Sequence, residues 1–371
     1  MIYLNNAATS YPKPPQVTEA VMAALNMPPE NQMRGTGGVM EPIADRLRRN
    51  MGCLMNIQAT DRIFFCSGAT DAANRIILGM TDAESDIIVS QTEHNSILRP
   101  LYNNPHTKDR ITVAPCDLYG MVDIGKLTEK DNSIIFINHC SNVTGYIQNI
   151  QHICSEAHRH GSIVVVDASQ SAGCIPIDVD GWGIDALIFT GHKSLLGPQG
   201  TGGWYMREGF PTAPAIYGGT GRDSSIITYI DDDWEFEVGT QNIPGLCGLN
   251  AGVEYILNKS IDCIYDTEKQ MTCELIASLN AISGVTVYSV GGSHQGPVVS
   301  FNVDGLSASD VGYILAQSYN ITVRTGLHCS PLIHESLNAD RYGTVRVSLS
   351  CLNTYHDIES LINAVREIAG A

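Results

Sequence analysis

Basic residues are scarce in this sequence, and their scarcity excludes one class of partner. The 371 residues include 22 Lys and Arg against 39 Asp and Glu, which gives a formal net charge of -17 at pH 7. Nucleic-acid phosphates are bound by clustered positive charge, and the sequence contains no cluster of Lys and Arg. We therefore expect no nucleic-acid partner and an acidic surface that promotes solubility.

Long apolar runs and paired cysteines are missing as well. No stretch reaches the roughly 18 apolar residues that a membrane-spanning helix requires. The start, Met1–Asn5, lacks the basic and apolar regions of a signal peptide. The 11 cysteines are scattered and form no Cys-x-x-Cys pair, which disfavours both a disulfide framework and a zinc ribbon. We expect a soluble, unprocessed cytoplasmic protein with no membrane partner.

Two motifs that would indicate other ligands are incomplete. The glycine-rich stretch 197–203 is not a Gly-x-Gly-x-x-Gly motif, and its neighbouring Lys193 precedes the glycines, unlike the lysine of a Walker P-loop. The pairs His139-Cys140 and His158–His160 lack further partners at metal-ligand spacing. We expect neither a nucleotide nor a metal.

The first two thirds of the chain predict a large α/β domain over residues 15–250. A helix is expected to begin near Pro15 and another to cover 41–54, with a loop at 28–38 between them. From residue 63 onward, short apolar runs alternate with helical stretches, which is typical of a mainly parallel sheet with crossover helices. Seven strands are expected, at 63–65, 87–90, 111–114, 134–138, 163–166, 186–189 and 203–206.

Beyond residue 250 the pattern changes to that of a smaller α+β domain, predicted to cover residues 251–371. Its expected helices lie at 251–257, 268–279, 309–318 and from 358 onward, and its expected strands at 285–288, 298–302, 321–324 and 344–349.

Polar residues follow most strands of the predicted large sheet. Ligands of open α/β sheets bind beyond the carboxyl ends of the strands, so one pocket is expected to collect these residues. They are Ser67–Thr70, Glu93-His94, Asn142, Asp167 with Gln170, and Thr190 with His192 and Lys193.

Three of these groups suggest chemistry, and each has an ordinary alternative. Lys193 follows a buried strand on a tight turn, which favours a reactive amine over a solvated lysine. Asp167 ends an apolar run, where it needs a cation unless it caps a helix. Ser67–Thr70 leads into a helical stretch and forms either a phosphate site or an ordinary helix start.

Taken together, these motifs resemble the class V aminotransferase family of pyridoxal-phosphate enzymes, and within it the cysteine desulfurases and selenocysteine lyases. The resemblance runs from Leu4–Thr9 to Val345–Ser348. It implies the aminotransferase fold type I, with residues 1–14 packed on the smaller domain. It also implies a homodimer that forms its active sites between the two subunits.

The resemblance assigns the cofactor, pyridoxal 5'-phosphate, to particular residues. Lys193 corresponds to the lysine that binds the cofactor covalently and moves protons, Asp167 to the partner of the ring nitrogen, and His94 to the group stacked on the ring. A histidine after a strand is otherwise often an ordinary loop residue. The remaining contacts are Asn142 and Gln170 near the phenolic oxygen, and Ala69, Thr70, Thr190, His192 and the neighbouring subunit's Thr240 around the phosphate.

Arg346 and Cys329 carry the expected substrate chemistry. Arg346 lies within an apolar strand and needs an anion, either a structural partner or a substrate carboxylate. The resemblance implies the carboxylate, with Arg324, Asn5 and Asn6 nearby. Cys329 corresponds to the sulfur-accepting cysteine, although a free cysteine is more often an inert buried residue.

The expected function is the removal of sulfur from L-cysteine, giving L-alanine and a persulfide on Cys329. Alternatives are a selenocysteine lyase acting on L-selenocysteine, or a thiol-independent lyase or aminotransferase of the same fold. The presence of Lys193 and Asp167 disfavours a non-enzymatic sulfur-relay protein. We also expect a partner protein that accepts the sulfur. The segment Arg34–Gly38 lacks a histidine that relatives often have there, which leaves substrate choice open.

Overall fold

The computed structural model describes residues 1–28, 41–82, 84–219, 225, 227, 236–339 and 343–370. The expected loop at 28–38, except Pro28, lies outside these residues, as does the Arg34–Gly38 segment.

A seven-stranded sheet in the order β2-β8-β7-β6-β5-β3-β4 forms the centre of the large domain. Neighbours pair in parallel from β7 to β4, whereas β8 runs antiparallel to both β2 and β7. The mainly parallel sheet predicted from the sequence is confirmed. Its strands are β2 Ile63–Cys66, β3 Ile87–Ser90, β4 Ile111–Ala114, β5 Ile134–Asn138, β6 Ile163–Asp167, β7 Ala186–Thr190 and β8 Gly202–Met206.

Both faces of this sheet are buried, which explains why its strands have continuous apolar runs. Along β5, Ile135 and Ile137 enter one core, whereas Ile134 and Phe136 enter the core on the opposite face. The first core is completed by α2 Ile43–Met55, α6 Ile150–Arg159, α7 Val179–Trp182 and α8 Ile243–Lys259, and the second by α3 Ala69–Gly79 and α4 Asn95–Asn103. The short helix α5 Ile124–Leu127 lies between β4 and β5, and the 3-10 turn η1 Thr60–Arg62 lies between α2 and β2. Helix α1 Pro15–Leu25 packs on α8.

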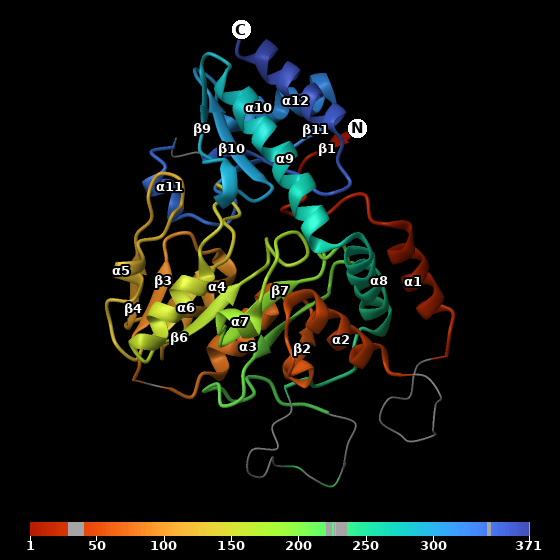
Figure 1. Cartoon of the computed structure of the whole chain (residues 1–371), viewed down its shortest axis with the longest axis vertical. Coiled ribbons are helices and arrows are strands. Elements are labelled where there is room, and N and C mark those ends of the chain that lie inside the picture. The colour runs from red at the N-terminus through yellow and green to blue at the C-terminus, as the bar shows by residue number, and fades with distance from the viewer. Residues whose placement is uncertain are drawn as a thin grey trace.

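The smaller domain is built on a four-stranded antiparallel sheet in the order β12-β13-β10-β9. The chain begins and ends at this domain (Figure 1). Strand β1, Ile2–Tyr3, pairs in parallel with β11, and Leu4 is fully buried in the small-domain core. The other elements are β9 Val285–Val287, η2 Gly292–His294, β10 Val298–Val303, α10 Ala308–Tyr319, β11 Ile321–Thr322, β12 Arg324–Gly326, α11 Ile333–Ser336, β13 Thr344–Ser348 and α12 Tyr355–Ile368.

Three expected elements of this part of the chain were wrong in extent. The helix expected at 268–279 is α9, Ile261–Asn280, which begins seven residues earlier. The strand expected at 321–324 is two strands, because residues 321–322 pair with β1 and residues 324–326 pair with β13. The helix expected at 251–257 is the end of α8, which begins at Ile243. Its first turns contain Pro244, Gly245 and Gly248, so the apolar spacing of a helix is obscured there.

Helix α9, Ile261–Asn280, connects the two cores. Ile264 packs in the large-domain core, whereas Met271 and Leu275 pack in the small-domain core. Figure 1 shows α9 rising from the large domain to the smaller one. The division expected at residue 250 stays a prediction, and this packing favours a boundary within α9.

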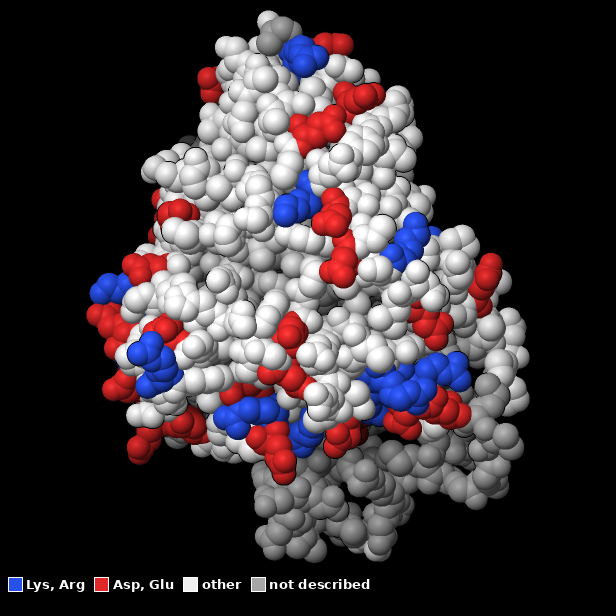
Figure 2. Space-filling view, viewed as in Figure 1, with Lys and Arg blue, Asp and Glu red and all other residues white. Residues whose placement is uncertain are grey.

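Charged side chains of both signs are interspersed on the face of the molecule shown in Figure 2, with blue groups flanked by red ones. Among the described residues, no helix is long and apolar enough to cross a membrane.

Candidate active site

A cavity of about 250 Å³ lies at the carboxyl ends of β5, β6 and β7, where side chains of both domains meet. Eleven of the expected site residues line it: Ala69, Thr70, His94, Asn142, Asp167, Gln170, Thr190, His192, Lys193, Arg324 and Arg346. Seven other residues expected at the site do not line it: Asn5, Asn6, Ser67, Gly68, Glu93, Thr240 and Cys329. The large sheet brings nine of the lining residues together because the strands that they follow end at the same edge, whereas Arg324 and Arg346 come from β12 and β13 of the smaller domain.

Lys193 lies on the turn that follows β7, and the N-terminal segment holds this turn in place. The Ser10 hydroxyl donates to the carbonyl of Lys193 at 2.8 Å, and the Lys13 amine donates to that of His192 at 2.9 Å. Burial lowers the pKa of the Lys193 amine to about 8, although the Asp167 carboxylate acts in the opposite direction. At pH 7 about one amine in ten is therefore in the neutral, nucleophilic form, far more than at the ordinary pKa of a lysine.

Asp167 ends β6 with its side chain directed to the cavity. Its Oδ1 accepts a hydrogen bond from the backbone N–H of Ser169 at 2.8 Å, and no α-helix starts at this position. Behind it lies the fully buried Glu93, whose Oε1 accepts from the Ser90 hydroxyl and the Asn138 backbone N–H. Burial and the charge of Asp167 raise the pKa of Glu93 to about 8, so Glu93 is mainly protonated at neutral pH.

His94 is the N-cap of α4 and presents a neutral ring to the cavity. Its Nδ1 accepts from the backbone N–H of Ser96 at 3.0 Å, which places the ring proton on Nε2. Burial and the nearby Lys193 lower the pKa of this imidazole to about 3.

The first turn of α3 supplies an anion site beside these groups. Its N-cap is Gly68, whose φ of +150° favours glycine, and no side chain caps the helix. The N–H groups of the first turn therefore remain free of a side-chain cap, and Ala69 and Thr70 of this turn line the cavity with Thr190 and His192.

Two guanidinium groups lie side by side on the small-domain wall of the cavity. Arg346 in β13 is paired in register with Arg324 in β12, and it is 1% exposed. Its Nη1 donates to the Asn142 carbonyl at 3.0 Å and its Nη2 to Asn5 Oδ1 at 3.2 Å, whereas Nε has no partner. Among the described residues, no carboxylate forms an ion pair with either arginine. This arrangement favours a bound carboxylate over a structural salt bridge.

Asn5 and Asn6 lie next to this wall but not on the cavity. Asn5 orients Arg346, as described above. The amide of Asn6 donates to the Ser348 carbonyl at 3.0 Å and to Asn353 Oδ1 at 3.1 Å, which fastens the N-terminal segment to the small domain.

Cys329 lies just outside the cavity and is linked to it by Arg324. The Nη2 of Arg324 donates to the Cys329 Sγ at 3.0 Å. His328 and Cys329 both have positive φ, +53° and +61°, and the Cys329 carbonyl accepts from the Asn95 backbone N–H at 2.8 Å. The amide of Asn142 donates to the His328 carbonyl at 2.7 Å and accepts from the Ser330 hydroxyl at 2.7 Å. The backbone is therefore held at His328 and Cys329, and the neighbouring Ser330 is held through its side chain.

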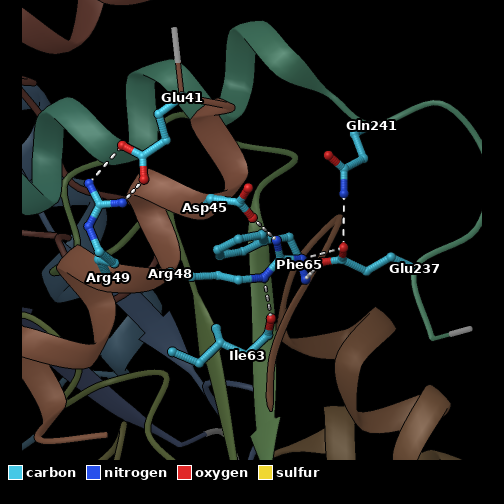
Figure 3. A network of polar contacts seen from close by, with 8 residues as sticks. All are labelled: Glu41, Asp45, Arg48, Arg49, Ile63, Phe65, Glu237 and Gln241. Carbon is cyan, nitrogen blue, oxygen red and sulfur yellow. Dashed lines mark hydrogen bonds and ion pairs between the residues drawn. The ribbon is translucent and has the colours of Figure 1, made fainter. Parts of the chain in front are cut away.

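Thr240 is exposed. Its sequence neighbour Glu237 contacts Arg48 and Phe65 of the large domain (Figure 3). Glu237 accepts from the Phe65 backbone N–H at 2.6 Å and from Gln241 Nε2 at 3.0 Å, and it pairs with Arg48 at 2.5 Å. The role expected for Thr240, contact with a neighbouring subunit's cofactor, stays a prediction.

Comparisons with known proteins agree with this geometry. The family model described as Aminotransferase class-V matches residues 2–361. The chain belongs to the class V aminotransferase family. It is 31% identical to a protein named probable cysteine desulfurase from Methanothermobacter thermautotrophicus, over 100% of this chain and 95% of that protein.

Two solved structures are similar to this class V aminotransferase. The apo cysteine desulfurase from Thermococcus onnurineus has a TM-score of 0.85 and 28% identity, and the alignment covers 100% of this chain and 94% of that one. The cysteine desulfurase CsdA from Escherichia coli has a TM-score of 0.86 and 26% identity, over 99% and 94% of the two chains. The fold and the family expected from the sequence are confirmed.

Membership of the class V aminotransferase family implies pyridoxal phosphate, and the cavity has the groups that this cofactor needs. Lys193 would provide an amine with a lowered pKa, Asp167 would face the ring nitrogen, and His94 would offer a neutral ring. The uncapped start of α3 provides donors for a phosphate. Within the described residues, no group of three or more His, Cys, Asp or Glu side chains forms a metal site.

Replacing Asp167 with Asn is expected to lower turnover by at least about a hundredfold, because an amide cannot balance a protonated ring nitrogen electrostatically. Steady-state kinetics measure turnover, and the absorbance of bound cofactor measures cofactor binding, so a loss of turnover is separated from a loss of cofactor. Glu93→Gln is the matched control, since Glu93 is already mainly neutral, and it should change turnover only slightly. Near-normal turnover of Asp167→Asn would show that this carboxylate serves only the local turn.

Sequence reasoning did not assign several residues that line the cavity: Ala7, Ala8, Ser96, Asn138, Cys140, Ser169 and His328. Most are sequence neighbours of an assigned residue. Ser96 follows His94 by two positions and Ser169 follows Asp167 by two, and each binds the side chain that it follows. A search of the residues two positions after each strand-end side chain would have found both.

Proposed function

We propose that this protein is a pyridoxal-phosphate-dependent cysteine desulfurase that converts L-cysteine to L-alanine and leaves a persulfide on Cys329. The observation that carries the proposal is the contact between the Cys329 thiol and Arg324, which lines the same cavity as Lys193. A thiol-independent lyase has no need of this contact. The names of the similar proteins support the same activity.

Each group of the chain has a distinct task in this reaction. A guanidinium at the small-domain wall binds the substrate carboxylate, and Lys193 moves a proton at the substrate α-carbon. Lys193, Asp167, His94 and the α3 N-terminus would hold the cofactor, which would supply an electron sink for that carbon.

The sulfur step balances without a further reductant or oxidant. The Cys329 thiolate attacks the substrate sulfur, so the S–S bond of the persulfide forms as the substrate C–S bond breaks. The carbon keeps the electron pair of the broken bond and takes up a proton. Cysteine and one protein thiol therefore become alanine and one protein persulfide.

Product analysis after incubation with L-cysteine tests this function. We expect one alanine for each persulfide in the absence of a reductant, and repeated turnover with release of sulfide when a thiol reductant is added. Peptide mass spectrometry should find one added sulfur atom on Cys329. Pyruvate with ammonia, or added sulfur on another cysteine, would contradict the proposal. Parallel incubation with L-selenocysteine measures the preference between the two substrates.

We further propose that the enzyme acts as a homodimer in the cytoplasm and passes its sulfur to an acceptor protein. The anchored, exposed segment that carries Thr240 supports the dimer. All 11 cysteines are free thiols, which is consistent with a reducing compartment. Sedimentation at assay concentration checks the dimer, and an active monomer would contradict it.

A further inference from the structure

We propose that the two arginines of the cavity have separate tasks: Arg324 holds Cys329 as a thiolate, and Arg346 alone receives the substrate carboxylate. This inference rests on the proposed desulfurase function. It differs from the expectation that both arginines serve the carboxylate.

The contacts of Arg324 point to the thiol. Its Nη2 lies 3.0 Å from the Cys329 Sγ, and no other side-chain hydrogen bond of Arg324 is formed within the described part of the chain. A guanidinium has donors but no acceptor, so the sulfur must accept. Hydrogen bonds to a charged group are stronger when both partners are ionised, and a cation beside a thiol raises the thiolate fraction. Arg324 is therefore placed to keep Cys329 ionised.

The contacts of Arg346 differ from those of Arg324, because they are made with oxygen atoms and not with the thiol. Arg346 is fixed by the Asn142 carbonyl and by Asn5, and it makes no hydrogen bond to Cys329. Its side chain borders the cavity, and its buried Nε has no partner. Burial and the neighbouring Arg324 lower the pKa of this guanidinium to about 9, and a bound carboxylate would offset both effects. A rigid guanidinium without an anion suits the carboxylate of an incoming amino acid.

The charges at the cavity support this division. The Asp167 carboxylate raises the pKa of Lys193 and is also the anion that would face the ring nitrogen of the cofactor, so it is not the partner of either arginine. No other carboxylate lies among the described residues that line the cavity, so the two guanidiniums have no carboxylate partner there. In this proposal the Cys329 sulfur is the partner of Arg324, and the substrate carboxylate is the partner of Arg346. If Arg324 bound the carboxylate instead, the thiol would lose the one cation with which it makes a hydrogen bond.

The arrangement also limits how the thiolate reaches the substrate. Because the carbonyls of His328 and Cys329 are held by Asn142 and Asn95, the Cys329 side chain must move by rotating away from Arg324. Arg324 is thus a positioning residue that keeps the nucleophile charged until it attacks.

Alkylation of Cys329 by iodoacetamide, measured across pH by peptide mass spectrometry on the cofactor-loaded protein without substrate, tests the thiolate. For Arg324→Gln we expect alkylation at neutral pH to fall about tenfold relative to the plateau at high pH, because the thiolate alone reacts. The plateau corrects for altered access to the thiol. Arg324→Lys should recover part of the loss, since it restores the charge. Arg346→Gln should change the pH profile of Cys329 alkylation less than Arg324→Gln does.

Steady-state kinetics test the other half of the inference. Arg346→Gln should mainly raise KM for L-cysteine, whereas Arg324→Gln should mainly lower kcat. Arg159→Gln, which alters an exposed surface arginine, is the control for both measurements. An unchanged alkylation profile in Arg324→Gln, or a larger rise in KM for this variant than for Arg346→Gln, would overturn the inference. The alkylation profile needs no turnover, so it gives a result even if the protein does not act on L-cysteine.

Discussion

The Lys193→Ala variant is expected to fold, to lose the visible absorbance of covalently held cofactor and to lose turnover by several orders of magnitude. Removal of the amine deletes both the covalent anchor and the group that moves the substrate α-proton. The turn itself should survive, because it is held through main-chain carbonyls that accept from Ser10 and Lys13. Absorbance spectra and borohydride reduction followed by peptide mapping measure the result.

Lys13 provides a matched control for this experiment. Its amine also lies near the cavity turn, and burial lowers its pKa to about 8, the same value as that of Lys193. Lys13→Ala should retain the reducible covalent cofactor on Lys193. A pyridoxyl group that stays linked to the protein in Lys193→Ala would show that another lysine holds the cofactor.

The Cys329→Ala variant is expected to bind cofactor and L-cysteine but to form no alanine from it. The substrate sulfur then has no thiolate acceptor, and the C–S bond stays intact. Absorbance changes on addition of substrate check binding, and alanine is quantified after a fixed incubation. Desulfuration of L-cysteine at the unmodified rate would replace the desulfurase proposal by a thiol-independent lyase.

Cys140 is the control, since it is the cysteine that lines the cavity directly. Burial raises the pKa of its thiol to about 12, so this thiol is almost fully protonated at neutral pH and a poor nucleophile. Cys140→Ala should still accumulate the persulfide on Cys329. If the added sulfur instead depends on Cys140, the acceptor has been assigned to the wrong thiol.

The large sheet could be predicted almost completely, because its strands are buried on both faces and leave continuous apolar runs in the sequence. Residues 134–138 are an example, with successive side chains in opposite cores. The same logic placed Asp167 and Lys193 in one cavity, since neighbouring parallel strands end at one edge. The small domain was less predictable. Residues 321–322 pair with β1 and residues 324–326 pair with β13, and the spacing of apolar residues does not show with which strand a segment pairs.

The position of Cys329 relative to the cavity could not be predicted for a different reason. It depends on two successive residues with positive φ and on the contact with Arg324, neither of which leaves a pattern in the sequence. The role of Thr240 cannot be tested in the structure of a single chain, because its expected contact needs a second subunit.

The backbone conformation of Cys329 has a consequence for how this position changes over evolutionary time. A side chain at a φ of +61° costs on the order of 1 kcal/mol relative to glycine, which adopts such angles freely. The chain is therefore less stable with cysteine here than it would be with glycine. A lineage that no longer needed the thiol would gain stability by drifting to glycine or asparagine at position 329. The residue found there indicates whether selection still maintains the sulfur chemistry.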